Sequence, residues 1–286
     1  MAKTYNTVYM DLRRALRRAG VEEAQLEARE LICHVTGKSR EDFYRSMQLY
    51  VVSETEEKIN ELARRRLEGE PLAYILGKWD FYGMELTVNP TVLIPRPDTE
   101  IIAQRAIEIA RSTGEHTRVL DLCCGSGCIG MAVAKHAPNC RVVLADISED
   151  VLTVARRNVS ANRLGGQITT FRADALTQPP EMIWDFNLIV CNPPYIPTED
   201  LNFLDPSVRE YEPMLALDGG EDGLKFYRQI AANWRGAMRS TCILLFEVGD
   251  GQVDDVEKIL SQNGYRSIRR HKDAFGNWRG VEGSVM

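Results

Sequence analysis

FNLIVC at Phe186–Cys191, followed directly by NPPY at Asn192–Tyr195, is the stretch that decides the fold expected for this chain. The apolar run predicts a strand buried in the middle of a parallel sheet, and the two prolines must end its ladder because they lack an amide hydrogen. In open α/β sheets, ligands bind outside the carboxyl ends of the strands. We therefore expect the tetrapeptide to lie at a binding site.

The chemistry of the tetrapeptide indicates what kind of group it binds. Pro193 and Pro194 have fixed φ angles and offer carbonyl acceptors without amide donors, and Asn192 adds a side-chain oxygen. Tyr195 adds an aromatic face. Two acceptors beside a flat ring suit a neutral, planar NH2 group. The alternative is a turn that only ends the strand, because Asn-Pro and Pro-Pro are ordinary loop dipeptides.

A glycine loop earlier in the chain predicts a second binding feature. A short apolar strand at residues 118–122 runs into Asp121-Leu122-Cys123-Cys124-Gly125-Ser126-Gly127, and a helix of small residues follows. Glycines let the backbone approach a ligand closely, and the helix N-terminus presents free amide hydrogens. The spacing D-x-x-x-G-x-G differs from the G-x-G-x-x-G of dinucleotide-binding loops. A tight strand-to-helix turn is the alternative.

Three acidic residues surround this loop in the expected sheet. Asp146 ends the next strand about 20 residues beyond the glycines, where an acid is placed to accept both ribose hydroxyls of a nucleoside. Asp174 follows the strand at residues 167–172 and is placed to accept from an adenine amino group, unless it is simply part of a loop. Asp121 is either a turn former or a partner for a ligand's ammonium group.

Composition sets broad limits on the class of protein. The chain has 286 residues, 44% hydrophobic and 27% charged, as expected for one large globular domain or two ordinary ones. A formal net charge of −6 argues against binding of duplex nucleic acid through a broad, positively charged surface. The N-terminal residues lack an apolar signal core and no stretch is long enough to span a membrane, so we expect a soluble, cytoplasmic protein.

The seven cysteines favour a reducing compartment, because an odd number in a long chain does not fit a disulfide framework. Four of them fall near or just beyond the glycine loop: Cys123, Cys124, Cys128 and Cys140. They lack paired C-x-x-C spacing, so we expect no metal site.

The hydrophobic pattern divides the chain into three parts. Residues 1–72 show apolar positions at three- and four-residue spacings and predict a small helical bundle, whose exposed arginines form either a solvated face or a docking surface for an anionic partner. Residues 73–97 predict a β-hairpin linker, with β runs at 79–88 and 91–94. Residues 98–286 predict an α/β sheet with an antiparallel edge, interrupted at 196–223 by an insertion that could cover the site.

Taken together, these motifs resemble a family. The glycine loop, the strand-end acid and NPPY are similar to class I S-adenosylmethionine-dependent methyltransferases that act on an amide or exocyclic amine. The run Leu93–Glu100 (LIPRPDTE), the segment Phe81–Gly83 and the helical bundle narrow the resemblance to the HemK/PrmC family, the peptide chain release factor glutamine methyltransferases. The similarity extends over essentially the whole chain.

The resemblance implies a fold and a reaction. The fold would be a Rossmann-like, seven-stranded, mostly parallel sheet with an N-terminal helical domain that recognises the release factor. The reaction would methylate the side-chain amide nitrogen of the glutamine in the GGQ motif of class 1 release factors, using S-adenosyl-L-methionine and giving N5-methylglutamine and S-adenosyl-L-homocysteine. The release factor would be the partner, and we expect a monomer without stable nucleic acid binding or membrane attachment.

The resemblance also implies roles for individual residues. Cofactor-binding positions would be Asp121, Cys123, Cys124, Gly125, Ser126, Gly127, Asp146, Asp174, Ala175 and Asn192, with residues 123–127 around the methionine part, Asp146 on the ribose, and Asp174 with Ala175 by the adenine. Asn192 and the Pro193 carbonyl would grip the glutamine amide, with Pro194 and Tyr195 completing the catalytic corner. Cysteines at 123 and 124 stand where small or hydroxylated residues are more usual, and Ala175 stands where an aromatic residue can occur.

Several other functions remain possible from the residues. A DNA or RNA base amino-methyltransferase would flip a base into the same pocket, but the acidic balance disfavours it. A nicotinamide dehydrogenase would need the G-x-G-x-x-G spacing. A cofactor-sensing module that only docks a partner is the non-enzymatic alternative. Self-methylation at Gly165-Gly166-Gln167 is conceivable, although a helix-to-strand turn explains the two glycines.

Overall fold

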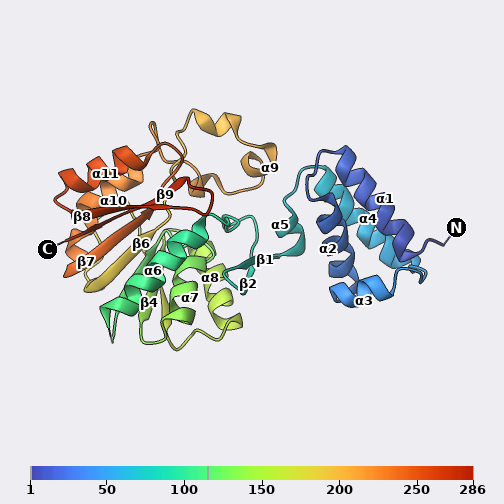
Figure 1. Ribbon diagram of the computed structural model, residues 1–286, viewed down its shortest axis with the longest axis horizontal. Helices are drawn as coiled ribbons and strands as arrows, with labels where there is room; N and C mark the ends of the chain where they lie inside the picture. The colour runs from blue at the N-terminus through green and yellow to red at the C-terminus, as the bar shows by residue number, and fades with distance from the viewer. Residues whose placement is uncertain (1, 115, 286) are drawn as a thin grey trace. The chain divides into compact units, whose positions relative to one another are not determined.

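The computed structural model describes residues 2–114 and 116–285 and divides them into two compact units. The first unit extends up to Gly77 and includes Pro206–Tyr211, and the second comprises Lys78–Asp205 and the chain from Glu212 onward. Figure 1 shows the two units with their elements labelled. Each unit has its own buried core, so each is described separately.

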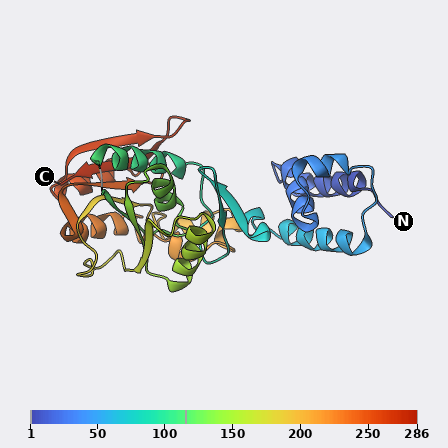
Figure 2. The same ribbon diagram turned by 90° about the horizontal axis from the view of Figure 1, so that it is seen from below.

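The first unit is a bundle of short helices. Its elements are α1 (Tyr5–Arg18), α2 (Ala24–Thr36), α3 (Arg40–Arg45), α4 (Ser53–Leu67), α5 (Leu72–Leu76) and α9 (Pro206–Arg209). Thr4 caps α1, because its hydroxyl accepts a hydrogen bond from the Thr7 amide at 3.2 Å, and Gly37 ends α2 in the left-handed conformation. Leu16 and Phe43 are fully buried in its core. Figure 2 shows the ribbon of the helices from a second side. The amphipathic spacing of the sequence therefore predicts this bundle correctly.

The second unit is built on a seven-stranded sheet of order β5-β4-β3-β6-β7-β9-β8. The strands are β3 (Arg118–Leu122), β4 (Arg141–Asp146), β5 (Ile168–Arg172), β6 (Phe186–Cys191), β7 (Met238–Glu247), β8 (Arg266–Lys272) and β9 (Trp278–Ser284). The first five run parallel, and β9 pairs antiparallel with both β7 and β8. This confirms the expected fold class, a mostly parallel α/β sheet with an antiparallel edge.

Helices cover both faces of the sheet, which is why its central strand is apolar apart from Asn187. On one face lie α6 (Thr99–Thr113), α7 (Cys128–His136) and α8 (Glu149–Ala161), and on the other lie α10 (Lys225–Asn233) and α11 (Val253–Gln262). Every residue of β6 is buried. Three 3-10 turns complete the unit: η1 (Asp200–Phe203), η2 (Met214–Ala216) and η3 (Trp234–Ala237).

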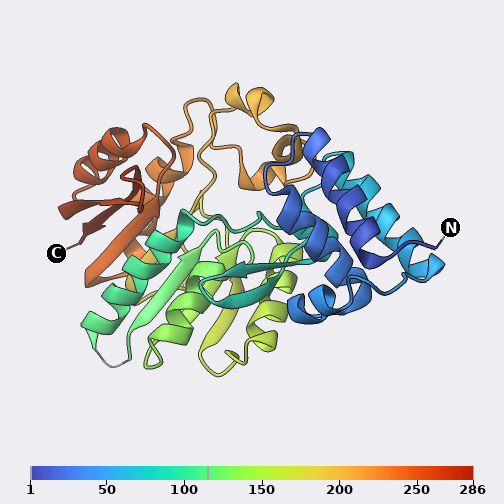
Figure 3. The ribbon, with the colours of Figure 1, turned by 45° about the vertical axis from the view of Figure 1, so that its right-hand side comes forward.

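The β-hairpin lies within the linker predicted at residues 73–97, and both of its strands come from the first of the two expected β runs. It consists of β1 (Lys78–Phe81) and β2 (Met84–Thr87), joined by Tyr82 and Gly83, which both have positive φ as a type I′ turn requires. Asn158 of α8 holds its end, accepting from the Thr87 amide at 2.7 Å and donating to the Thr87 carbonyl. The hairpin thus packs on α8 within the second unit, and Figure 3 shows the ribbon from a further side.

The β run expected at residues 91–94 is wrong, because that segment forms no strand. Prolines at 90 and 95 bracket it and remove amide donors from its ends. The segment instead contributes to the wall of a cavity, described below.

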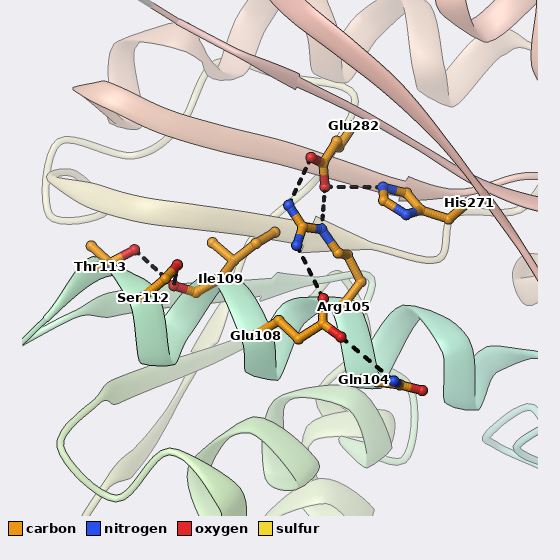
Figure 4. A network of polar contacts seen from close by, with 8 residues as sticks. All are labelled: Gln104, Arg105, Glu108, Ile109, Ser112, Thr113, His271 and Glu282. Atoms are coloured by element: carbon orange, nitrogen blue, oxygen red, sulfur yellow. Dashed lines mark hydrogen bonds and ion pairs between the residues drawn. The ribbon is translucent and has the colours of Figure 1, made fainter.

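A buried ion cluster ties α6 to the antiparallel edge of the sheet. Glu282 of β9 accepts two hydrogen bonds from Arg105 of α6, at 2.7 and 2.9 Å, and lies 3.0 Å from Nε2 of His271 on β8 (Figure 4). Arg105 also reaches Glu108 one turn along the helix at 3.1 Å. All three contacts to Glu282 come from basic side chains, so the cluster anchors the helix firmly.

Candidate active site

Strand register brings the two sequence motifs together at one edge of the sheet. β3 pairs with β6 so that Leu122 lies opposite Cys191, and β6 pairs with β7 so that Cys191 lies opposite Phe246. The glycine loop and NPPY therefore leave neighbouring strands side by side. After β3 the chain continues to one side of the sheet and after β6 to the other, so this is the crevice where such sheets bind ligands.

The glycine loop is closely packed at Gly127 and open beside Gly125. Gly125 and Gly127 have φ of 53° and 82°, and Gly127 is the N-cap of α7. A Cβ at Gly127 would lie 2.9 Å from a methyl group of Leu144, whereas one at Gly125 would meet no atom within 4 Å. Because Gly125 lines the cavity, the space beside it is free for a ligand.

Asp121 lies under the loop and outside the cavity lining. Its carboxyl is buried and accepts a hydrogen bond from the Gly130 amide in the first turn of α7 at 2.8 Å. Burial raises the pKa of Asp121 to about 8. In this structure it braces the loop against the helix, and it is not placed to touch a ligand in the cavity.

Asp146 ends β4 and faces the cavity. Its two carboxylate oxygens accept from the Gly125 amide at 3.2 Å and the Ser148 amide at 3.1 Å, which fixes their direction. Burial raises the pKa of Asp146, while these amide hydrogen bonds oppose the rise. The hydrogen bond to Gly125 also couples the acid directly to the glycine loop.

The cavity has a volume of about 360 Å³ and contains most of the predicted site residues. Those on its wall are Cys123, Cys124, Gly125, Ser126, Asp146, Asp174, Ala175, Asn192 and Pro194. Gly127, Pro193 and Tyr195 lie next to these residues in the chain but do not line the cavity, and neither does Asp121.

Other parts of the wall were not assigned a binding role from the sequence. They come from the segment at residues 91–96, from Ile147 after the acid, from Pro213–Ala216, and from Phe226 on α10. The first segment overlaps the run LIPRPDTE, which served only for the resemblance, and Pro213–Ala216 belong to the insertion that was expected to be able to cover the site. Ile147 is an apolar residue directly after a strand-end acid and is 40% exposed here, whereas Phe226 carried no signal.

The NPPY corner is held from behind by a glutamine and three glycines. Gln252, the N-cap residue of α11, donates to the Tyr195 carbonyl at 2.9 Å and accepts from the Gly249 amide at 3.1 Å. A Cβ added at Gly219 would lie 2.7 Å from the Tyr195 Cα. One added at Gly223 would lie 2.3 Å from the Tyr195 carbonyl oxygen, and one added at Gly249 would lie 2.9 Å from the Tyr195 ring. The corner therefore packs against a slot formed by these three glycines, where larger residues would collide with Tyr195.

Burial favours the neutral form of three cysteines and one tyrosine in or beside the site. Burial raises the pKa of Cys124, Cys128 and Cys191, and it raises the pKa of Tyr195 to about 12. Among the residues that the structure describes, no group of three or more His, Cys, Asp or Glu is placed to hold a metal ion. The cavity thus combines apolar walls with hydrogen-bonding groups, and Asp146 is an acid that lines it.

The fold and site define the class first: a Rossmann-like methyltransferase. A model of the methyltransferase small domain matches residues 103–205, and a model of the PrmC N-terminal domain matches residues 8–77. A methyltransferase of Pyrococcus furiosus has a similar fold, with a TM-score of 0.51, 16% identity, and coverage of 79% of this chain and 98% of that one.

The relatives then give the family. A release factor glutamine methyltransferase of Geobacter sulfurreducens is 40% identical over 268 residues, covering 93% of this chain and 91% of that protein. One of Thermodesulfovibrio yellowstonii is 38% identical over 253 residues, covering 87% and 88%. The chain belongs to the release factor glutamine methyltransferase family, which confirms the resemblance seen in its motifs.

Of the helices in the described ranges, none is long and apolar enough to cross a membrane.

Proposed function

We propose that this protein transfers a methyl group from S-adenosylmethionine to the side-chain amide nitrogen of the GGQ glutamine in class 1 peptide chain release factors. The products are N5-methylglutamine and S-adenosylhomocysteine. The observation that carries the proposal is the register that puts Asn192 beside the glycine loop on one cavity wall. Family membership supports the same reaction.

The cavity residues fit the cofactor. The open space beside Gly125 leaves room for the methionine part, and the oriented carboxylate of Asp146 suits two ribose hydroxyls. Ile147 provides an apolar surface for a flat base, with Asp174 and Ala175 on the same wall. The cofactor supplies a methyl group already activated on a sulfonium centre.

The NPPY corner would hold the acceptor nitrogen. An amide nitrogen is a poor nucleophile because its lone pair is shared with the carbonyl, so the protein must favour the geometry in which that sharing is lost. The Asn192 side-chain oxygen and the Pro193 carbonyl can accept the two NH2 hydrogens and bind them more tightly as positive charge develops on the nitrogen. Orientation of this kind is worth about 7–11 kcal/mol.

The helical domain at residues 1–72 would recognise the release factor, leaving cofactor binding to the second unit. Every residue found on the cavity wall belongs to that second unit. We further propose that the protein acts as a monomer in the cytoplasm without stable binding to nucleic acid, in line with its net charge of −6.

Transfer of a radioactive methyl group to a purified release factor tests the proposal. We expect label on the intact factor, its loss when the GGQ glutamine is replaced, and mass spectrometry that places the methyl on that glutamine. DNA and RNA serve as competing acceptors in the same assay. Transfer to a nucleic acid with none to the release factor would contradict the proposal.

A further inference from the structure

Glu247 lies directly behind Asn192 at the same edge of the sheet. It is the last residue of β7, one place beyond Phe246, and Phe246 pairs with Cys191, the residue before Asn192. Phe246 and Cys191 both point into the core beneath α10 and α11. Because side chains alternate along strands, Glu247 and Asn192 share the opposite face.

The carboxyl of Glu247 is buried and only partly satisfied. The residue is 3% exposed, and its side chain interacts with the Thr99 hydroxyl at the start of α6 and with the Asn192 amide. Its Oε2 has no hydrogen-bond partner within the described part of the chain. A buried polar atom without a hydrogen-bond partner lowers the stability of the fold, so a buried carboxyl of this kind suggests a functional role.

Glu247 stands outside the cavity, whereas both of its side-chain partners line it. Thr99 and Asn192 are on the wall and Glu247 is not. It can therefore reach a ligand only through these two residues. The Glu247 carboxyl therefore cannot contact the substrate, but it can set the orientation of the Asn192 side-chain amide.

We propose that Glu247 is a positioning residue that orients the Asn192 side chain for methyl transfer. A carboxylate can only accept hydrogen bonds, so the Asn192 Nδ2 must face it. The Asn192 Oδ1 is then left to face the cavity, where it can accept from the acceptor's NH2 group. This inference rests on the proposed function, in which the Asn192 side-chain oxygen accepts a hydrogen bond from the NH2 group of the substrate.

The protonation state of Glu247 would control this orientation. Burial raises its pKa to about 7, with the negative charge of Asp98 adding to the rise and the positive charge of Arg279 opposing it. The other titratable groups facing it are neutral side chains: Cys128 of α7, Tyr195 of the corner and Tyr227 of α10. A protonated carboxyl can donate to the Asn192 Oδ1 and so occupy the atom that the substrate needs.

The test compares two variants of Glu247 with a matched buried glutamate. In Glu247→Ala we expect kcat to fall about 10- to 100-fold, because the half-buried Asn192 amide loses its partner, with the cofactor Kd unchanged. In Glu247→Gln we expect a smaller loss of kcat. Wild-type kcat/KM should rise as pH increases through about 7, and Glu247→Gln should lack this inflection.

Glu282→Gln is the control, since Glu282 is equally buried on β9 but bonds to Arg105 and His271. It should lower stability and keep the inflection near pH 7. Wild-type kcat and an unchanged pH profile in Glu247→Gln would overturn the inference, even if Glu247→Ala fails to fold.

A second readout needs no acceptor protein. In protein labelled with 15N-asparagine, the Asn192 side-chain amide signal, assigned by its loss in Asn192→Ala, should titrate near pH 7 and should stop titrating in Glu247→Gln. A signal that does not titrate in the wild type overturns the inference about Glu247. Absence of transfer by the wild type overturns the proposed function, and the amide titration still decides the role of Glu247.

Discussion

At the scale of single residues, we propose that the site separates cofactor binding from acceptor binding. Asp146 contacts the glycine loop, and Asn192 lies on the wall of the same cavity. We expect Asp146→Ala to raise the cofactor Kd about 10-fold or more, since each hydrogen bond to a carboxylate is worth about 1.5–3 kcal/mol. Asn192→Ala should abolish turnover and leave the Kd nearly intact. Calorimetry for the Kd and label transfer for turnover check both, and an equal loss of both quantities in either variant would contradict the division of roles.

At the scale of elements, the segment at Gly219–Gly223 and the start of α11 hold the NPPY corner in place. Gly219→Ala would put a methyl group 2.7 Å from the Tyr195 Cα, so the corner must move. Small misplacements of catalytic groups cost as much as about 100-fold in rate, so we expect a loss of that order in kcat. Gly165→Ala is the matched control, because a Cβ there meets no atom within 4 Å. Equal rates for the two variants in the transfer assay would refute a positioning role for the slot.

A second prediction at this scale concerns the ion cluster between α6 and the sheet edge. Burial alone would raise the pKa of Glu282, but hydrogen bonds from His271 and Arg105 outweigh it and lower the pKa to about 2. The carboxylate therefore contributes stability above its unfolded pKa near 4.5, and this contribution is lost as pH falls toward 2. Its size is at most about 3 kcal/mol. Urea unfolding at several pH values should show a stability loss in Glu282→Gln at pH 7 that shrinks over this acid range. A loss that stays constant down to pH 2 would disprove the linkage.

At the scale of the whole molecule, we propose that the two compact units have separate functions, with acceptor recognition in the first and cofactor binding in the second. Phe43 is fully buried in the first unit, and Phe→Ala in a core costs about 3–5 kcal/mol. We expect Phe43→Ala to loosen the helical bundle, raise the KM for the release factor several-fold, and leave the cofactor Kd unchanged. Titration of the acceptor in the transfer assay and calorimetry of the cofactor measure the two effects. A changed cofactor Kd with a normal KM would argue against the proposed division.

The sequence by itself determined the fold class and the order of the motifs, and it predicts the kind of group that each motif binds. FNLIVC could only be a strand covered on both faces, and NPPY and Asp146 follow strand ends, where their chemistry can be read locally. Only the tertiary structure decided that residues 91–94 form a cavity wall and no strand, that Asp121 braces α7 beneath the loop, and that Glu247 stands behind Asn192. The physical reason is that strand character and backbone chemistry are properties of neighbouring residues. Register, burial and hydrogen-bond partners are set by contacts between segments far apart in the chain.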